Sequence, residues 1–231
     1  MRLYGLQKLT LLDYPGHTAC TVFTGGCNFR CPFCHNASLV ETDRLPDRVE
    51  EEAVFDLLRR RKGLLDGVCV TGGEPLLHRD IGAFLGRIKD LGFAVKLDTN
   101  GSFPQRLSEL LEERLVDYVA MDVKNAPDRY PETVGLPVFD PAPVTESIRL
   151  LLAGTVPYEF RTTVCRGLHD ADSIARAAQW IEGADKYFLQ QFRDSGDVLS
   201  GGMGPCTAEE MAAMAEAARP FVKSVELRGV G

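Results

Sequence analysis

The sequence lacks any apolar run of about 18 residues, so no segment is expected to span a membrane. Its first residues, MRLYGLQK, also lack the apolar stretch and small-residue cleavage site of a secretory signal. Basic residues are not in excess, because 26 Lys and Arg stand against 33 Asp and Glu, a net charge of −7. That balance argues against a broad electrostatic contact with nucleic acid or an anionic membrane. We therefore expect a cytoplasmic protein that binds neither.

Internal repeats, low-complexity tracts and Gly/Ser-rich linkers are also absent, and the composition, 45% hydrophobic and 26% charged, is typical of globular proteins. We therefore expect residues 1–231 to form one domain. Short β-rich runs alternate with helical periods from residue 67 onward, which is typical of βαβ units and a parallel sheet. The expected strands cover residues 18–25, 67–71, 93–99, 116–124, 157–164 and 186–192, with a further run at 223–227.

Amphipathic helices are expected between the strands, because apolar residues recur at the i, i+3, i+4, i+7 spacing that lines one helix face. The clearest sets lie in residues 81–91, 107–111, 148–152, 174–181 and 211–218. The pair Met211 and Met214 in the last set is expected in the core. Six strand-helix units of this kind can form either an incomplete barrel or a doubly wound sheet, and both bind ligands at the C-terminal ends of the strands.

Capping-box pairs mark two helix starts in the sequence. Asp47 with Glu50 predicts a start near residue 48, and Thr207 with Glu210 predicts one near residue 208. Two further stretches, 26–47 and 125–143, are predicted to be long loops, which in compact domains are often functional. The Gly-rich segment 200–204 is a third loop that can shape a docking surface or serve as a solvated connector.

Three of the seven cysteines lie within eight positions, in the sequence Cys27-Asn28-Phe29-Arg30-Cys31-Pro32-Phe33-Cys34. This odd, crowded set does not fit a secreted disulfide framework. Three thiolates on one loop suit a soft metal. Structural zinc normally uses four ligands in two pairs, and no second cysteine pair exists, although His35 could complete a zinc site. A four-iron cluster held by three cysteines would leave one iron open for chemistry.

The spacing Cys-x3-Cys-x2-Cys, with Phe33 before the last cysteine, resembles the signature of the radical S-adenosylmethionine (SAM) superfamily. The similarity to its glycyl-radical-enzyme activase branch is close over residues 5–36 and extends through Gln190-Gln191-Phe192, so it covers most of the chain. The resemblance implies that the three cysteines hold a 4Fe–4S cluster whose fourth iron binds SAM. It implies that SAM is cleaved reductively to a 5′-deoxyadenosyl radical that removes a hydrogen atom. The predicted fold class is α/β, an incomplete (β/α)6 TIM-like barrel in a single domain.

Motifs at the strand ends supply the other expected contacts. Residues 71–75 (TGGEP) resemble the family's site for the SAM amino group, because glycines allow close approach and Glu74 can accept from an ammonium. The resemblance implies that Lys124 meets the SAM carboxylate. It also implies that oxygens of Asp98, Thr99 and Asp122 hold a monovalent cation. The predicted cluster ligands are Cys27, Cys31 and Cys34, and the predicted SAM contacts are Phe33, Gly72, Gly73, Glu74, Asp98, Asp122, Lys124, Arg161 and Gln190. No side chain is assigned as a catalytic acid or base.

Each motif also has a structural interpretation. The glycines at 72–73 can form a tight turn, and Asn100-Gly101 can form a strand-end turn. Arg161 can pair with Glu159 or Asp122, and Asp122 can form a surface ion pair with Lys124. A histidine that contacts SAM in related activases is matched by Phe192, which leaves the contact from the sixth strand open. The other cysteines are expected to be small buried hydrophobes, with a redox or cluster role open for the last: Cys20, Cys69, Cys165 and Cys206.

The resemblance implies a glycyl-radical enzyme as partner, with anaerobic ribonucleotide reductase as the first choice. Reduced flavodoxin or ferredoxin is the expected electron donor. Two other functions stay open at this point. One is a radical SAM enzyme that acts on a small molecule or another peptide, and the other is a non-catalytic zinc or electron-transfer module. Metal analysis and SAM cleavage on reduction separate the last from the others.

Overall fold

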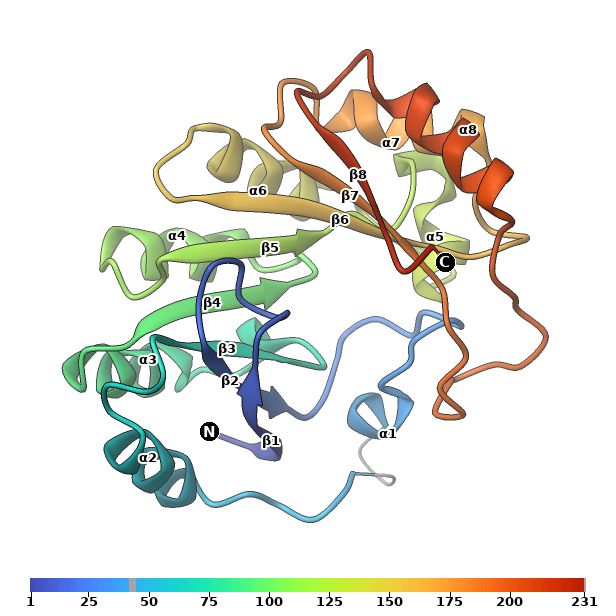
Figure 1. The fold of residues 1–231 in the computed structure, drawn as a ribbon. Helices are drawn as coiled ribbons and strands as arrows, with labels where there is room; N and C mark the ends of the chain where they lie inside the picture. The colour runs from blue at the N-terminus through green and yellow to red at the C-terminus, as the bar shows by residue number, and fades with distance from the viewer. Residues whose placement is uncertain (42–44, 231) are drawn as a thin grey trace. The chain divides into compact units, whose positions relative to one another are not determined.

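The structure is a computed structural model of the chain that describes residues 1–41 and 45–230. Strands and helices alternate along most of the chain (Figure 1). The strands are β1 (Leu3–Thr10), β2 (Ala19–Thr24), β3 (Gly67–Gly72), β4 (Ala94–Thr99), β5 (Tyr118–Asp122), β6 (Tyr158–Val164), β7 (Tyr187–Gln191) and β8 (Val225–Arg228). The helices are α1 (Ala37–Val40), α2 (Glu51–Arg60), α3 (Ile81–Asp90), α4 (Pro104–Glu112), α5 (Tyr130–Val134), α6 (Ala142–Leu152), α7 (Ala171–Trp180) and α8 (Ala208–Ala218), with short 3-10 helices η1 (Pro75–Leu77) and η2 (Pro127–Arg129).

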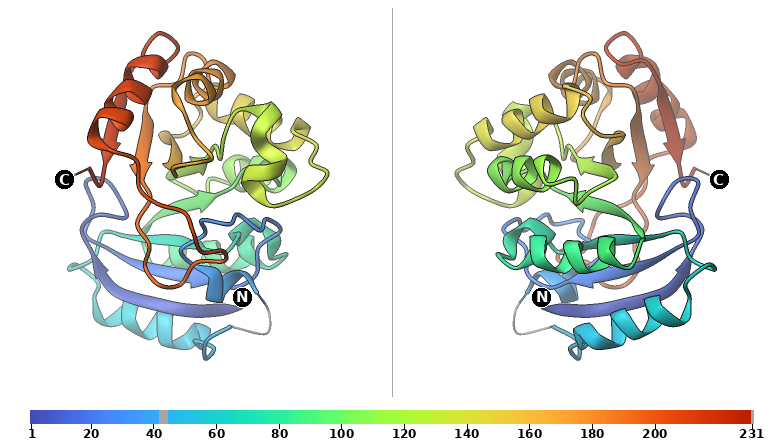
Figure 2. Two further views of the ribbon diagram at one scale, coloured as in Figure 1. Left: turned by 90° about the vertical axis from the view of Figure 1, so that its right-hand side faces the viewer. Right: turned by 90° about the vertical axis from the view of Figure 1, so that its left-hand side faces the viewer.

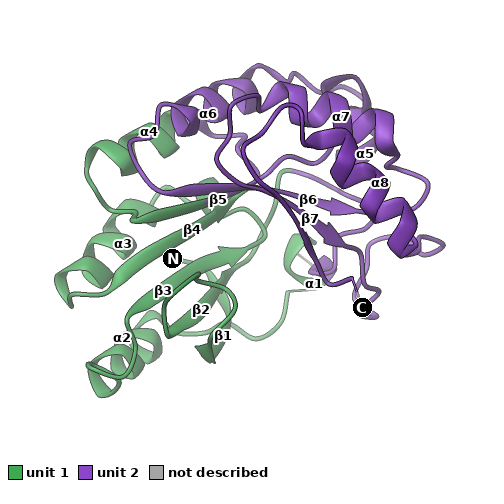
Figure 3. Cartoon of the chain, turned by 45° about the horizontal axis from the view of Figure 1, so that its top comes forward, with its two compact units in different colours: residues 1–28, 38–99, 105–119 green, residues 29–37, 100–104, 120–231 purple. Residues whose placement is uncertain are grey.

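The chain divides into two compact units, drawn in different colours in Figure 3. Unit 1 comprises residues 1–28, 38–99 and 105–119, and unit 2 comprises residues 29–37, 100–104 and 120–231. In unit 1, β1 pairs antiparallel with β2, and β2, β3 and β4 pair in parallel. In unit 2, β6, β7 and β8 pair in parallel. Strand order follows chain order from β1 to β8, as expected for successive βαβ units.

Unit 1 buries the apolar faces of its helices. Phe55 of α2 and Phe84 of α3 meet edge to face, with ring centroids 5.5 Å apart, and both rings are almost fully buried. Helix α2 lies beside β1 in both views of Figure 2. Tyr14, Ala19 and Tyr118 form a further buried cluster. This cluster packs the loop between β1 and β2 onto the unit.

Unit 2 has its own core. Helices α7 and α8 pack against each other, and Met211 and Met214 of α8 are buried as predicted. The Thr162 hydroxyl donates to the Val123 carbonyl at 2.5 Å and lies 2.7 Å from the Tyr187 hydroxyl, which therefore donates to it. Because these three groups come from β6, the end of β5 and β7, the bonds tie the strands of unit 2 together.

All seven expected strand segments contain a strand, but the pattern misses β1. Three consecutive residues of β1 are exposed, so it has no period-2 apolar alternation, and its backbone pairing with β2 includes register shifts. Helix α2 begins at Glu51, and Glu50 makes no side-chain capping bond. The capping box predicted from Asp47 and Glu50 is therefore wrong, whereas the one at Thr207 is confirmed.

Both predicted long loops contain short helices. Within 26–47 the chain forms α1, and residues 42–44 of that stretch lie outside the described residues. Within 125–143 it forms η2 and α5, so the loop prediction is wrong there. Tyr130 is fully buried, stacks on Phe139 and meets Phe29 edge to face. Packing of this aromatic group outweighs the prolines that the sequence pattern treats as loop signals.

Over residues 1–41 and 45–230, none of the helices combines the length and the apolar character needed to cross a bilayer.

The cap of α8 gives a test of this local structure. The Thr207 hydroxyl accepts from the Glu210 amide at 3.1 Å, and the Glu210 carboxylate accepts from the Thr207 amide at 2.6 Å. We predict that Thr207→Ala lowers the free energy of unfolding by about 1 kcal/mol in urea denaturation. Thr207→Ser keeps the oxygen and is the control. Equal stability of the alanine variant and the wild type would contradict the assigned cap.

Candidate functional site

Two glycines at the end of β3 lie against the backbone that precedes Cys27. The Gly73 amide donates to the Thr24 carbonyl at 2.9 Å, and the Glu74 amide donates to the Gly26 carbonyl at 2.8 Å. A Cβ on Gly73 would lie 2.0 Å from the Gly26 oxygen, and Gly72 has a φ of +124°. No other residue fits this approach. The glycine pair therefore holds the chain in place just before the first cysteine of the motif.

The Glu74 carboxylate is fully buried beside this turn. Its Oε1 accepts from the Leu76 amide at 3.0 Å, which caps η1, and from the Thr99 hydroxyl at 2.8 Å. Glu74 thus links the end of β3 to the end of β4. The structure shows this anchoring role, and the contact of Glu74 with SAM stays a prediction.

Asp98 follows a buried lysine that the sequence analysis did not single out. The Lys96 ammonium forms an ion pair with the Asp98 carboxylate, and its Nζ lies 3.8 Å from the Cys69 sulfur. The signal in the sequence was a charged residue between the apolar residues Val95 and Leu97 of an expected strand. Cys69 itself is buried, like Cys20, Cys165 and Cys206, as expected.

Asp122, at the end of β5, lies between two cations in unit 2. Lys124 Nζ is 2.9 Å from its Oδ2, and Arg161 Nε is 2.9 Å from its Oδ1. Burial alone would raise the pKa of Asp122, but the charges of Arg161 and Lys124 outweigh this and hold it below its ordinary value. Asp122 is thus one of the two partners predicted for Arg161, and Glu159, the other, forms an ion pair with Arg228 at 3.0 Å. The carboxylate is therefore ionised and fixed.

Lys124 also lies within electrostatic range of two motif cysteines. Burial would lower the pKa of Lys124, but Asp122 and Cys31, with a smaller effect of Cys34, raise it above its ordinary value. Burial raises the pKa of the Cys34 thiol, and Lys124 opposes that effect. A lysine cation next to thiolates fits an anionic cluster and the carboxylate of a ligand bound to it. The structure thus brings together Cys31, Cys34 and Lys124.

The three cysteines of the motif are divided between the two units. Cys27 lies in unit 1, whereas Cys31 and Cys34 lie in unit 2. Among the residues that the structure describes, no three His, Cys, Asp or Glu side chains are grouped closely enough to hold a metal ion. Three thiolates fit the ligand chemistry of a 4Fe–4S cluster. Their assignment as its ligands stays a prediction from the motif.

His169 is a buried residue that connects two segments of unit 2. Its Nδ1 lies 3.1 Å from the Cys165 amide, and its Nε2 lies 2.8 Å from the Lys124 carbonyl. Because the Cys165 amide can only donate, Nδ1 is the acceptor of that bond. Nε2 therefore carries the hydrogen and donates it to the Lys124 carbonyl oxygen. Phe33, which is buried, meets the imidazole edge to face at 6.0 Å. His169 therefore positions both Phe33 and the backbone of Lys124.

A late segment of the chain packs on the cysteine loop within unit 2. The Ser200 amide donates to the Pro32 carbonyl at 3.0 Å, and the Ala37 amide donates to the Asp197 carbonyl at 3.3 Å. Gly204 forms a bridge with Arg166. The sequence predicts a docking surface or a connector for 200–204, and the structure shows in addition that this segment supports the loop that carries Cys31 and Cys34.

The end of β7 carries two glutamines of different character. Gln190, the predicted SAM contact, is half-buried. Gln191 donates through Nε2 to the Cys206 carbonyl at 2.6 Å, while its buried Oε1 has no hydrogen-bond partner within residues 1–41 and 45–230. A buried amide oxygen of this kind is typical of a site that a ligand or water completes. Phe192 is fully buried, so the residue that replaces the expected histidine belongs to the core.

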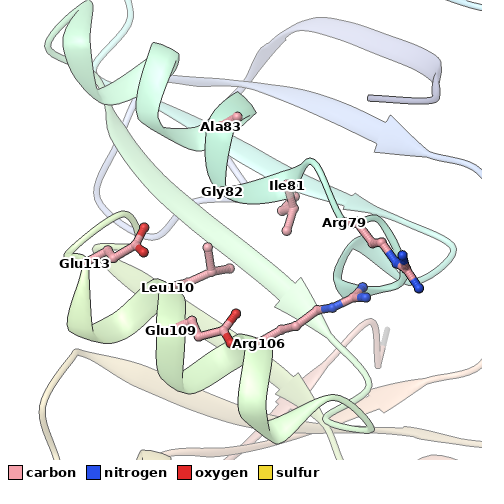
Figure 4. A pocket seen from close by; sticks show the side chains of 8 residues that line it. All are labelled: Arg79, Ile81, Gly82, Ala83, Arg106, Glu109, Leu110 and Glu113. Atoms are coloured by element: carbon pink, nitrogen blue, oxygen red, sulfur yellow. The ribbon is translucent and has the colours of Figure 1, made fainter.

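Two grooves of unit 1 are lined mostly by residues other than those described above. One has a volume of about 400 Å³ between α3 and α4, with Arg79 and Arg106 facing each other at one end and Glu113 at the other (Figure 4). None of the predicted site residues lines it. A second cavity, of about 410 Å³, includes Gly25 and Gly26, the residues just before Cys27.

Comparisons with known proteins agree with the motif. The family model described as "Radical SAM superfamily" matches residues 21–180. The "Putative glycyl-radical enzyme activating enzyme MJ1227" of Methanocaldococcus jannaschii is 31% identical over 237 residues, which cover 98% of this chain and 95% of that protein. The "Pyruvate formate-lyase-activating enzyme" of Listeria monocytogenes is 31% identical over 135 residues, 53% of each chain.

Solved structures show the same fold at low identity. Streptococcus suis SuiB bound to precursor peptide SuiA has a TM-score of 0.71 at 13% identity, covering 90% of this chain and 48% of that chain. A domain of pyruvate-formate lyase-activating enzyme from Bacteroides vulgatus has a TM-score of 0.56 at 18% identity, covering 71% of this chain and 99% of that chain. The predicted fold class, an α/β incomplete (β/α)6 TIM-like barrel, is confirmed.

The glycine turn before Cys27 generates a test. We predict that Gly73→Ala lowers the free energy of unfolding by roughly 2 kcal/mol, because its Cβ would overlap the Gly26 carbonyl oxygen. Gly82→Ala is the matched control: its Cβ would make an ordinary 3.6 Å contact in α3. That variant should be as stable as the wild type or more stable by up to about 1 kcal/mol. Similar stabilities of both variants in urea denaturation would contradict the close approach.

His169 gives a pH-dependent prediction. Burial lowers the pKa of His169 below its ordinary value of 6.5, so the unfolded chain takes up a proton first as the pH falls. The stabilising effect of the neutral imidazole is complete above pH 6.5 and is lost below it. When the pH is lowered from about 7.5 to about 5.5, the free energy of unfolding should therefore fall less for His169→Gln than for the wild type. An identical slope for both proteins in denaturant titrations would show that His169 does not titrate on unfolding.

Proposed function

The chain belongs to the radical SAM superfamily, and we propose that it activates a glycyl-radical enzyme by removing a Cα hydrogen from a glycine of that partner. The observation that carries the proposal is the similarity, over nearly the full length of both chains, to a protein named as a glycyl-radical enzyme activating enzyme. Anaerobic ribonucleotide reductase is the partner we propose first. Reduced flavodoxin or ferredoxin is the proposed electron donor, the cytoplasm the proposed location, and residues 1–231 the proposed single domain.

Radical SAM proteins use a 4Fe–4S cluster and SAM, which together supply the one-electron cleavage that starts hydrogen abstraction. In this chain we assign cluster binding to Cys27, Cys31 and Cys34. The glycine turn at 72–73 supports this assignment, because it positions the backbone that leads into Cys27. The segment around Ser200 does the same for the loop that carries Cys31 and Cys34.

Lys124 is the residue we propose to bind the SAM carboxylate. Asp122, Lys124 and Arg161 together carry a net charge of +1, since one carboxylate lies between two cations. These side chains are no more than 27% exposed, so water screens that charge less than at an open surface. Such a group favours an anionic ligand. We place Arg161 as the residue that orients Asp122, and Asp122 as the residue that orients Lys124.

Phe33 and the glutamines complete the proposed site. Phe33 is held against His169 and offers an apolar contact next to Cys34. Gln191 Oε1, which has no hydrogen-bond partner among the described residues, adds an acceptor at the end of β7, next to the predicted SAM contact Gln190. Gly72, Gly73 and Glu74 remain the proposed site for the SAM amino group.

The test is anaerobic incubation of the iron- and sulfide-loaded protein with a reductant, SAM and anaerobic ribonucleotide reductase, followed by electron paramagnetic resonance. We expect a glycyl-radical doublet on the partner with the wild type and none with Cys34→Ala. Cys206→Ala is the matched control, because Cys206 is a buried cysteine outside the motif, and it should keep the signal.

Other outcomes overturn the proposal in distinct ways. SAM cleavage without a partner radical, together with consumption of a small molecule or another peptide, would reassign the substrate. A protein that retains zinc and no iron or sulfide after anaerobic purification would exclude radical chemistry.

A further inference from the structure

The expected monovalent cation site does not fit the structure. Its predicted ligands were Asp98, Thr99 and Asp122. In unit 1, Asp98 is paired with the Lys96 ammonium, and the Thr99 hydroxyl donates to Glu74 at 2.8 Å. In unit 2, the two oxygens of Asp122 are each 2.9 Å from a cationic nitrogen. Within each unit, a side chain of the protein already neutralises the carboxylate that the cation would need.

Lys96 is placed for this role by the strand itself. Residues two apart in a strand point to the same face, so Lys96 and Asp98 face the same side of β4. Their side chains are only 2% and 13% exposed. A buried ammonium costs several kcal/mol unless it is paired, so the pair is a fixed unit. The Cys69 sulfur, 3.8 Å from Nζ, contributes a weak polar contact on the neighbouring strand.

A metal ion at Asp98 would have to compete with this lysine. It would either displace an ammonium tethered two residues away or add a second positive charge next to it. The tether gives the ammonium an effective concentration on the order of mM or higher at the carboxylate. At Asp122, each carboxylate oxygen already lies 2.9 Å from a cationic nitrogen, so a further cation would have to displace Lys124 or Arg161 or lie next to both. Both arrangements therefore oppose uptake of sodium or potassium.

We propose that the Lys96 ammonium is the fixed counter-cation of Asp98 and takes the place of a monovalent metal ion, so that SAM binds to this protein without a requirement for sodium or potassium. The proposal rests on the proposed use of SAM. It assigns Lys96 as a positioning residue that holds Asp98 and touches no reacting atom.

The experiment measures the SAM dissociation constant of the cluster-loaded protein at equal ionic strength in tetramethylammonium, sodium or potassium chloride. For the wild type we expect less than about a twofold difference among the salts. In Lys96→Met, which leaves Asp98 without its ammonium, sodium or potassium should tighten SAM binding by about fivefold or more. The Na-23 resonance should broaden with Lys96→Met and stay as in buffer with the wild type.

Two controls separate this role from a general effect of removing a buried charge. Lys96→Met combined with Asp98→Asn removes both charges and should lose the salt dependence again. Lys89→Met removes a lysine that pairs with Asp117 elsewhere in unit 1 and should show no salt dependence.

The wild-type measurement decides the question even where the single variant does not fold. Tightening of SAM binding by sodium or potassium in the wild type by about fivefold or more would overturn the proposal. So would a folded Lys96→Met without salt dependence, or a double variant that keeps it. Absence of SAM binding in every salt would instead overturn the proposed function.

Discussion

The site depends on one constraint, which is that a charged group buried in the protein must be paired or hydrogen-bonded. An unpaired buried charge costs several kcal/mol, and at Asp98 and Asp122 the partner that offsets this cost also fixes the position of the carboxylate. Asp98 is held by Lys96, and Asp122 is held by Lys124 and Arg161. At Asp122, the ion pair offsets the free-energy cost of burying the carboxylate. It also places the charge of Lys124 close enough to Cys31 and Cys34 to interact with them electrostatically. Both sets of ion pairs therefore offset the cost of burial, and the one at Asp122 also places positive charge near the two cysteines of unit 2.

Backbone contacts set the other half of the geometry. At the end of β3, the amides of the glycine turn and of Glu74 donate to the carbonyls of Thr24 and Gly26. The Glu74 carboxylate accepts from Thr99 and so links that turn to β4. In unit 2, His169 bonds to the carbonyl of Lys124 while packing on Phe33. Neither connector needs to touch a ligand. Each restricts the backbone conformations of the segment that carries a functional side chain, and a preorganised site requires such restriction.

Family membership could be predicted from the cysteine spacing because ligand spacing within one loop is a local property. The strands were predictable for a similar reason, since buried parallel strands are apolar runs bounded by polar turns. The missed features are long-range. Strand β1 exists through its backbone pairing with β2, and α5 exists because Tyr130 packs between Phe29 and Phe139. The apolar pattern within a segment cannot anticipate contacts that depend on a partner outside that segment.

By itself, the sequence determined the thiolate motif, the alternation of strands and helices, and the placement of polar residues at strand ends. Only the tertiary structure decided which of those polar groups meet. It paired Arg161 with Asp122 and Glu159 with Arg228, placed the Lys96 ammonium next to Asp98, and brought residues 195–204 onto the cysteine loop. The physical reason is that the order of residues along the chain fixes only which polar groups lie near each other in sequence. The free-energy cost of burying charge, together with close packing, determines which of them contact each other in the folded protein.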